Sequence, residues 1–233
     1  MTLRSWVDET LAEAIGRTSR QDPVLPDTGG PAGNARLTAW TGLLVLGLFI
    51  IEVGTVLDLS RFMSWHVVVG VLLVPTALLK TGTTGWRIVN YYTKRAPYRL
   101  AGPPPMPLRL LGPLVILVTL AVLGSGLALI VLGPLASRTG FLTVLGYQID
   151  AVGVHKAAIV AWAGVISLHT ASRLIPALRI VTESRRRGLQ VPGGFPRLMV
   201  LVTTLLVAAI AATFVFRMAS PWLSPGVLHL HVR

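Results

Sequence analysis

The most unusual feature of this sequence is the placement of three histidines within long apolar stretches. The segment HKAAIVAWAGVISLH begins with His155 and ends with His169, and the segment HVVVGVLLVPTALLK begins with His66 and ends with Lys80. In an α-helix, an interval of fourteen residues places both ends on nearly the same face, about 21 Å apart. Ionisable side chains at such depth in a membrane are costly and usually serve function. The repeated interval therefore indicates two sites stacked along a pair of helices.

Five apolar stretches supply the helices that must carry these residues. The chain is 53% hydrophobic and only 13% charged, and each stretch is close to the length of about 20 residues that crosses a bilayer. Their approximate bounds are 37–57, 64–86, 110–132, 152–181 and 197–216. The sequence therefore predicts an all-α, multi-pass membrane protein.

The basic residues are concentrated in alternate connections. The N-terminal segment and the second-to-third and fourth-to-fifth connections are rich in arginine, whereas the other connections hold only Arg61 and Arg138. The positive-inside rule then places the N-terminus in the cytoplasm and the C-terminus outside the cell inner (plasma) membrane. The net charge of +12 belongs to these loops, so we expect no nucleic-acid partner. The chain has no cysteine, which excludes thiolate-bound clusters and cysteine nucleophiles.

Topology pairs the four donors by depth. The second and fourth spans run in the same direction, so His66 and His155 should both lie near the outer side, and Lys80 and His169 in the inner half. A b-type haem with two axial ligands needs one donor on each face, normally from two facing helices. We therefore expect two haems b, an outer one held by His66 and His155 and an inner one held by His169 and Lys80. The alternative for Lys80 is a lysine that extends to the cytoplasmic interface.

These paired donors resemble those of transmembrane di-haem cytochromes b, including the cytochrome b561-like proteins and the N-terminal four-helix core of quinol-oxidising cytochrome b. The resemblance covers residues 37–181, and the families have histidine where this chain has Lys80. It implies a four-helix haem-binding bundle, to which this chain adds a fifth transmembrane helix. Residues 1–36 would form a cytoplasmic amphipathic helix, lying on the membrane surface, and a linker. Residues 182–233 would form a basic loop, the fifth span and an external tail.

Several other residues could support the haems. Small residues would let a helix backbone approach a flat macrocycle, as glycines do in the similar cytochrome b core, and basic side chains could pair with haem propionates. Ordinary helix packing and the positive-inside rule explain the same residues equally well. The haem-packing and propionate candidates are Gly54, Gly126, Trp162, Arg61, Arg87, Lys156 and Arg173.

Glu52 is the acid that lies deep in a predicted span, and it suggests a proton acceptor beside a quinone. With the outer-loop residues Tyr147, Gln148 and Asp150 it could form a quinol site near the outer haem.

The sequence thus favours transmembrane electron transfer between a quinone pool and a separate redox protein. The chain would be an electron-transfer subunit or a quinone-linked oxidoreductase. It would contact membrane lipid and could form a homo-oligomer. The external tail, with Trp222, His229 and His231, could meet a partner outside. No nucleotide-binding motif is present. The alternative is a non-redox membrane scaffold or small-solute carrier with structural histidines, although five spans without an inverted repeat are unusual for a carrier.

Overall fold

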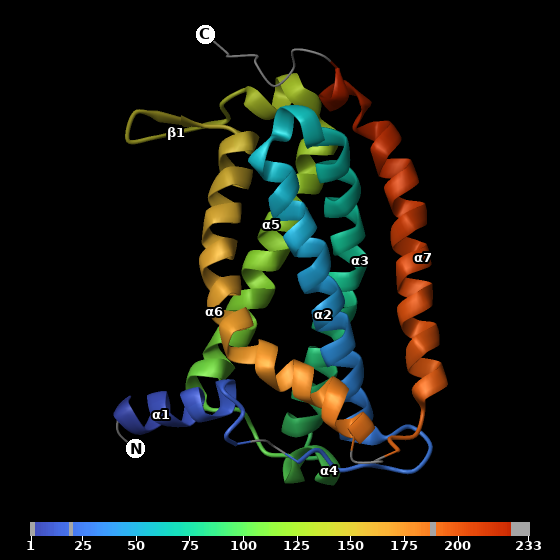
Figure 1. Ribbon diagram of the computed structural model, residues 1–233. Helices are drawn as coiled ribbons and strands as arrows, with labels where there is room; N and C mark the ends of the chain where they lie inside the picture. Colours follow the sequence, from blue (N-terminus) through green and yellow to red (C-terminus); the bar gives the residue numbers. More distant parts are fainter. Residues whose placement is uncertain (1–2, 19–20, 187–189, 225–233) are drawn as a thin grey trace.

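Five long apolar helices dominate the computed structural model, which describes residues 3–18, 21–186 and 190–224 (Figure 1). Each is long and apolar enough to cross a membrane, which confirms the prediction of five such helices in an all-α membrane protein. The tail with His229 and His231 lies outside the described residues. The five helices are α2 (Gly30–Leu57), α3 (Leu59–Tyr92), α5 (Met106–Arg138), α6 (Ala151–Arg186) and α7 (Gly194–Met218).

The remaining elements are short and lie at the two ends of the long helices. Helix α1 (Leu3–Ala14) and α4 (Ala96–Leu100) lie at the end that holds the N-terminus, and the 3₁₀ helix η1 (Ser220–Leu223) lies at the other. Strands β1 (Leu142–Val144) and β2 (Tyr147–Ile149) form an antiparallel hairpin between α5 and α6. The sequence predicted only a loop in that place.

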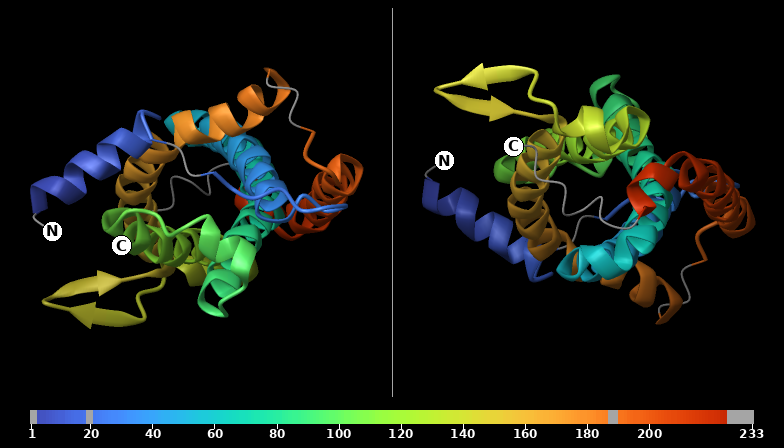
Figure 2. Two further views of the ribbon diagram at one scale, coloured as in Figure 1. Left: turned by 90° about the horizontal axis from the view of Figure 1, so that it is seen from below. Right: turned by 90° about the horizontal axis from the view of Figure 1, so that it is seen from above.

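Four of the long helices form a ring, and the fifth lies outside it. Helix α2 packs mainly on α3 and α5 packs mainly on α6, while contacts of α2 with α6 and of α3 with α5 close the ring (Figure 2). Helices α3 and α6, which carry the predicted donors, therefore face each other across a diagonal. Helix α7 packs against the outside of α3, where the small buried residues Ala208 and Ala212 permit a close approach.

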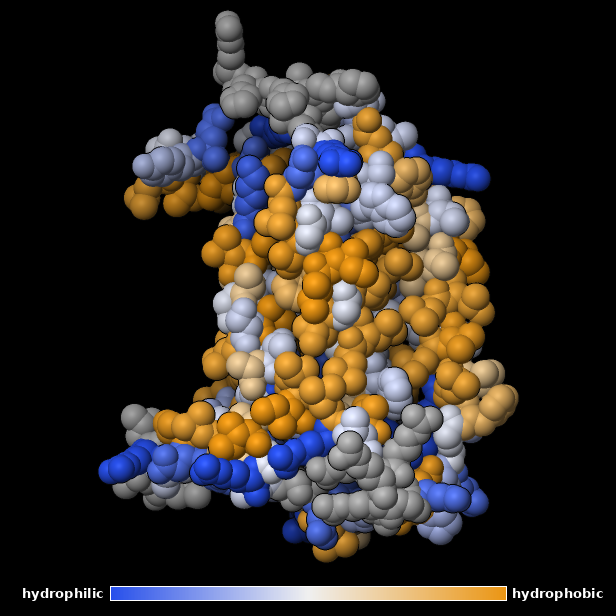
Figure 3. Space-filling model, in the orientation of Figure 1, coloured by the Kyte–Doolittle hydropathy of each residue, from blue (hydrophilic) through white to orange (hydrophobic). Residues whose placement is uncertain are grey.

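The helices extend beyond the predicted spans because hydropathy detects only the part of a helix that is apolar. Helix α2 already begins at Gly30, inside the segment that was expected to be a linker. Pro31 suits this position, because backbone N–H groups in the first turn of a helix have no partner within the helix, so the missing N–H of proline costs nothing there. On the surface, the apolar parts of the helices form a broad hydrophobic belt, with hydrophilic residues toward both ends (Figure 3).

Local signals explain two of the helix boundaries. The single residue Asp58 separates α2 from α3, and its Oδ1 accepts hydrogen bonds from the Ser60 hydroxyl (2.6 Å) and the Arg61 amide (3.2 Å). These two bonds lower the pKa of Asp58, since they stabilise the ionised carboxylate that caps α3. Near the C-terminal end of α5, Gly133 has a φ of 74° just before Pro134, and the helix is interrupted there.

Candidate functional site

The structure brings His66 on α3 and His155 on α6 close enough for their charges to interact. The Nδ1 atom of His66 lies 2.9 Å from Oε1 of Glu52 on α2. An ionised carboxylate can only accept a hydrogen bond, so this contact places the proton of a neutral His66 on Nδ1. The lone pair of Nε2 is then free to bind a ligand such as iron.

A different hydrogen bond gives His155 the same tautomer. The Oγ atom of Ser125 on α5 lies 2.8 Å from Nδ1 of His155, and the Ser125 hydroxyl donates to the Val122 carbonyl (3.1 Å). Because that hydroxyl proton is already engaged, the Ser125 oxygen is an acceptor for Nδ1–H of His155. Both histidines of the outer pair therefore keep Nε2 as the atom available for coordination.

Two glycines make room for this pair. A Cβ on Gly126 of α5 would lie 3.2 Å from Cε1 of His155, so the imidazole packs directly against the helix backbone. A Cβ on Gly70 of α3 would lie 3.3 Å from Oε1 of Glu52, so the carboxylate also approaches a bare backbone. Gly54, the other predicted packing glycine, has no atom within 4 Å of such a position.

The second pair lies closer to the end of the ring that holds the N-terminus, where Lys80 on α3 and His169 on α6 interact electrostatically. The Nε2 atom of His169 is buried and has no hydrogen-bond partner among the residues that the structure describes. A buried polar atom without a partner costs free energy, about 1 to 3 kcal/mol, and such an atom requires an explanation. A bound ligand on Nε2 would provide one.

The side chain of Lys80 points into the ring rather than toward the aqueous end. Its Nζ atom lies over Gly42 of α2, at 2.7 Å from the position that a Cβ would take there. Within the described part of the chain, this Nζ makes no hydrogen bond and no ion pair. The basic residues His169 and Arg173 lie close enough to interact with it electrostatically. This placement does not fit a lysine that extends to the interface.

Trp162 lies on α6, seven residues from each histidine of that helix, and connects three helices between the two pairs. Its Nε1 donates to Oγ1 of Thr119 on α5 (3.0 Å), and its ring meets Phe49 of α2 edge to face, with the centroids 4.6 Å apart. Both contacts hold the indole inside the ring, at the level between the outer and the inner pair.

The arginines expected to meet propionates are engaged by carboxylates of the N-terminal segment. Arg173 donates to Glu13 (2.6 Å), which is buried and lies next to the last residue of α1. Arg87 of α3 forms a two-bond pair with Asp22 (2.6 and 2.9 Å).

The two outer-side basic candidates have other surroundings. Arg61 lies over the ring of its neighbour Phe62. Lys156, next to His155 in the sequence, is exposed.

The structure does not bring the expected quinol-site residues together. Glu52 bonds to His66 and to Thr55, whose hydroxyl lies 3.4 Å from Oε2. Tyr147 is 78% exposed on the hairpin, which projects away from the ring (Figure 1). Asp150 instead caps α6 by accepting from the Gly153 amide (2.6 Å), and the side chain of Gln148 packs over Gly140.

Sequence reasoning missed Ser125, Gly42 and Glu13. Ser125 is adjacent to the glycine that was identified, and a hydroxyl beside a packing glycine is a usable signal for a histidine partner. Gly42 and Glu13 gave no comparable signal, because their roles depend on contacts between distant segments.

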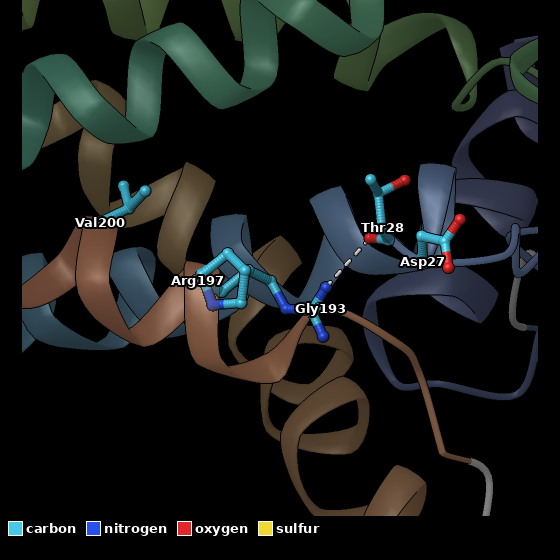
Figure 4. A pocket seen from close by; sticks show the side chains of 6 residues that line it. Asp27, Thr28, Gly193, Arg197 and Val200 are labelled. Carbon is cyan, nitrogen blue, oxygen red and sulfur yellow. Dashed lines mark hydrogen bonds between the residues drawn. The ribbon is translucent and has the colours of Figure 1, made fainter.

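A hollow of about 200 Å³ lies where the N-terminal segment meets the start of α7 (Figure 4). The Arg197 guanidinium beside it donates to the carbonyls of Thr28 (3.2 Å), Val191 (2.9 Å) and Pro192 (2.8 Å). Because backbone groups satisfy this side chain, it serves to hold the N-terminal segment against the fifth helix.

Within the described residues, no group of three or more acidic or histidine side chains could enclose a metal ion. The donors come in pairs instead. Comparison of the chain with protein-family models, with curated proteins and with solved structures found no match in any of the three.

Proposed function

We propose that this chain is a membrane-bound di-haem cytochrome of the b type, which carries single electrons between a quinone pool and a separate redox protein. One observation carries the proposal. The diagonal helices α3 and α6 hold two donor pairs. Contacts at Nδ1 orient both imidazoles of the outer pair, and in the inner pair the buried Nε2 of His169 has no hydrogen-bond partner among the described residues. When bound, haem would supply one-electron redox chemistry, and the protein supplies ligands, spacing and electrostatics.

The residues present fit such a cofactor. His66 and His155 would hold the outer haem through Nε2, and His169 and Lys80 would hold the inner haem through Nε2 and Nζ. The buried and unpartnered Nε2 of His169 is the strongest support, since an ordinary structural histidine would have found a hydrogen-bond partner. Gly42 and Gly126 leave room beside one donor of each pair.

The two donor pairs differ in ways that would separate their chemistry. Glu52 accepts a hydrogen bond from Nδ1–H of His66 and makes that imidazole a stronger electron donor, whereas the neutral Ser125 hydroxyl does less for His155. The inner pair has an amine in place of an imidazole and lies beside the cation Arg173. We therefore expect the outer and inner sites to have different reduction potentials.

Trp162 lies at the level between the pairs, where Thr119 and Phe49 hold its ring. Fourteen residues separate the donors along each helix, or about 21 Å of helical rise. Electron transfer across most of the membrane would then take place within the ring, and α7 would not take part in it.

The proposal includes the orientation expected from the sequence, with the N-terminus on the cytoplasmic side of the inner (plasma) membrane and the outer pair near the external side. A quinone belongs to the proposal as well, at a site other than the group of Glu52, Tyr147, Gln148 and Asp150, which the structure does not bring together. Glu52 bonds to His66, so its direct role would be to orient a ligand of the outer haem. It would affect a quinone only indirectly, through that haem.

A scaffold or carrier with structural histidines is the second candidate. The hydrogen bonds of His66 and His155 would serve that role too, because a carboxylate and a hydroxyl satisfy imidazoles in any context. The inner pair separates the two functions, since a scaffold gives Nε2 of His169 and the inward Nζ of Lys80 nothing to bind.

The test is to compare Lys80→Ala with Lys94→Ala in protein purified after expression with added haem. Lys94 is an exposed lysine just beyond the end of the donor helix α3 and provides a control away from both pairs. If Lys80 is a ligand, the first variant loses or alters one of two haem signals in the electron paramagnetic resonance and absorption spectra, and the control keeps both. Two unchanged signals in Lys80→Ala would remove Lys80 from the ligand set.

A further inference from the structure

The hairpin β1–β2 is apolar on one face and polar on the other. Its cross-strand pairs are Leu142 with Ile149, Thr143 with Gln148, and Val144 with Tyr147. Opposed residues of an antiparallel pair share a face, and successive residues alternate. The first and third pairs therefore form an apolar face, and the polar pair lies on the reverse side.

The tip of this hairpin is also apolar, in a position where that is unusual. Leu145 and Gly146 both have positive φ values (51° and 83°), as the central residues of a type I′ turn require. Asn, Asp or Gly normally takes the first of these positions, because a branched or bulky side chain is strained there. Leu145 is nevertheless 94% exposed. The chain thus presents leucine at the most protruding point of the hairpin, where no residue of the ring covers it.

Helix α1, at the opposite end of the molecule, has the same character. Val7, Leu11 and Ile15 are spaced by four residues and are 46%, 54% and 45% exposed. They form one apolar stripe along α1 and the turn after it. In Figure 3 the hydrophobic side of α1 faces the belt of the long helices and the hydrophilic side faces away. The hairpin mirrors this arrangement at the other end of the belt, with its hydrophobic side toward the belt.

The two elements are attached to the same helix at a separation that matches a bilayer. The hairpin leads directly into Ala151, the first residue of α6, and α1 is tied to α6 by the ion pair of Glu13 with Arg173. Arg173 is 22 residues beyond Ala151, about 33 Å of helical rise. The hydrocarbon core of a bilayer is about 30 Å thick. Both elements project from the side of the ring that α5 and α6 form, away from α7 (Figures 1 and 2).

We infer that the β1–β2 hairpin is a membrane-surface anchor, which lies in the lipid headgroup region with Leu145 and its apolar face in the acyl-chain boundary. Together with α1 on the opposite surface, it brackets α6 and fixes the depth of that helix in the bilayer. The occupant is lipid because the apolar face continues the belt that the bilayer covers, and because it faces the same belt as α1 from the opposite end. This inference is independent of haem and holds for a scaffold as well as for a cytochrome.

The absence of cysteine from the chain permits a clean test. Leu145→Cys, Val144→Cys and Thr143→Cys are each labelled with a fluorophore and reconstituted in vesicles of phosphatidylcholine and phosphatidylglycerol. Quenching by lipids that are brominated on the acyl chain reports contact with the bilayer, and quenching by aqueous iodide reports exposure to water. Thr143, one residue away on the polar face, is the matched control.

We expect labels at positions 145 and 144 to lose several-fold more emission to brominated lipid than the label at position 143, and the reverse for iodide. If all three labels respond equally to iodide and none responds to brominated lipid, the hairpin stands in water and the inference is overturned. Labels at 145 and 144 that are shielded from both quenchers would show that protein covers this face, which also overturns it.

Discussion

Replacing Gly126 with alanine should disturb the outer donor pair, whereas the same change at Gly124 should not. A Cβ at position 126 would lie 3.2 Å from Cε1 of His155, closer than the ordinary contact range of 3.4–4 Å. Nothing lies within 4 Å of a Cβ at position 124. The imidazole cannot simply move away, because Ser125 holds its Nδ1 at 2.8 Å.

The expected cost follows from comparing the two variants. Both exchange glycine for alanine within α5, so a gain in helix propensity of about 1 kcal/mol is common to them and cancels in the difference. Only Gly126→Ala adds a methyl group to an occupied space, and such overpacking costs about 1 to 3 kcal/mol. Gly126→Ala should therefore be less stable than Gly124→Ala by about 1 to 3 kcal/mol.

Unfolding in mild detergent, followed by circular dichroism against denaturant concentration, measures this difference. Equal slopes of the two transitions would show that a shift of the midpoint is a change in stability. In haem-loaded protein, the low-spin signal of one haem should also change in Gly126→Ala alone. Equal midpoints and equal spectra in both variants would refute the placement of His155 against Gly126.

Two further predictions concern the end of the ring that lies near the N-terminus. Gly42→Ala should displace the Nζ atom of Lys80, 2.7 Å from the added Cβ, and change the inner haem signal at little cost in stability, because a lysine end group moves easily. Gly47→Ala, on the same helix with nothing within 4 Å, should leave that signal unchanged, and an identical effect of both would contradict the inward position of Lys80. Arg173→Ala should destabilise the protein by about 1 to 3 kcal/mol, because it removes the guanidinium that lies 2.6 Å from the buried Glu13 carboxylate. Adding Glu13→Gln to that variant should restore part of the loss in a denaturant titration, and full additivity of the two changes would speak against the pair.

The sequence was sufficient to predict the long helices and to place four possible donors on two of them. Hydropathy gives the five apolar helices because a bilayer demands long apolar runs. The fourteen-residue intervals place His155 with His169, and His66 with Lys80, because helices repeat regularly over that distance. The expected topology pairs them across the helices instead, and His66 lies close enough to His155, and Lys80 to His169, for electrostatic interaction. That either pair binds haem stays a prediction.

Contacts between distant segments could not be predicted in the same way. Arg173 and Glu13 are 160 residues apart and Arg87 and Asp22 are 65 apart, so no local pattern connects them. Both arginines seemed equally suited to propionates, because a guanidinium binds any carboxylate.

The hairpin was missed for a different reason. Its strands have three residues each, and its turn holds Leu145 where the usual Asn-Gly or Asp-Gly signal would stand. The hairpin can be recognised only from the backbone conformation. The role of its apolar face can be recognised only from its position relative to the hydrophobic belt.

The most direct test of the central claim is the haem content of the purified protein. Absorption spectra of the oxidised and the dithionite-reduced protein, with a pyridine haemochrome determination, give the type and number of haems per chain. The donor pairs predict two haems b per chain, with His169→Ala reducing the count to one and leaving the outer haem in place. Well-folded protein that shows no Soret band after expression with added haem would contradict the account, and the histidines would then be structural.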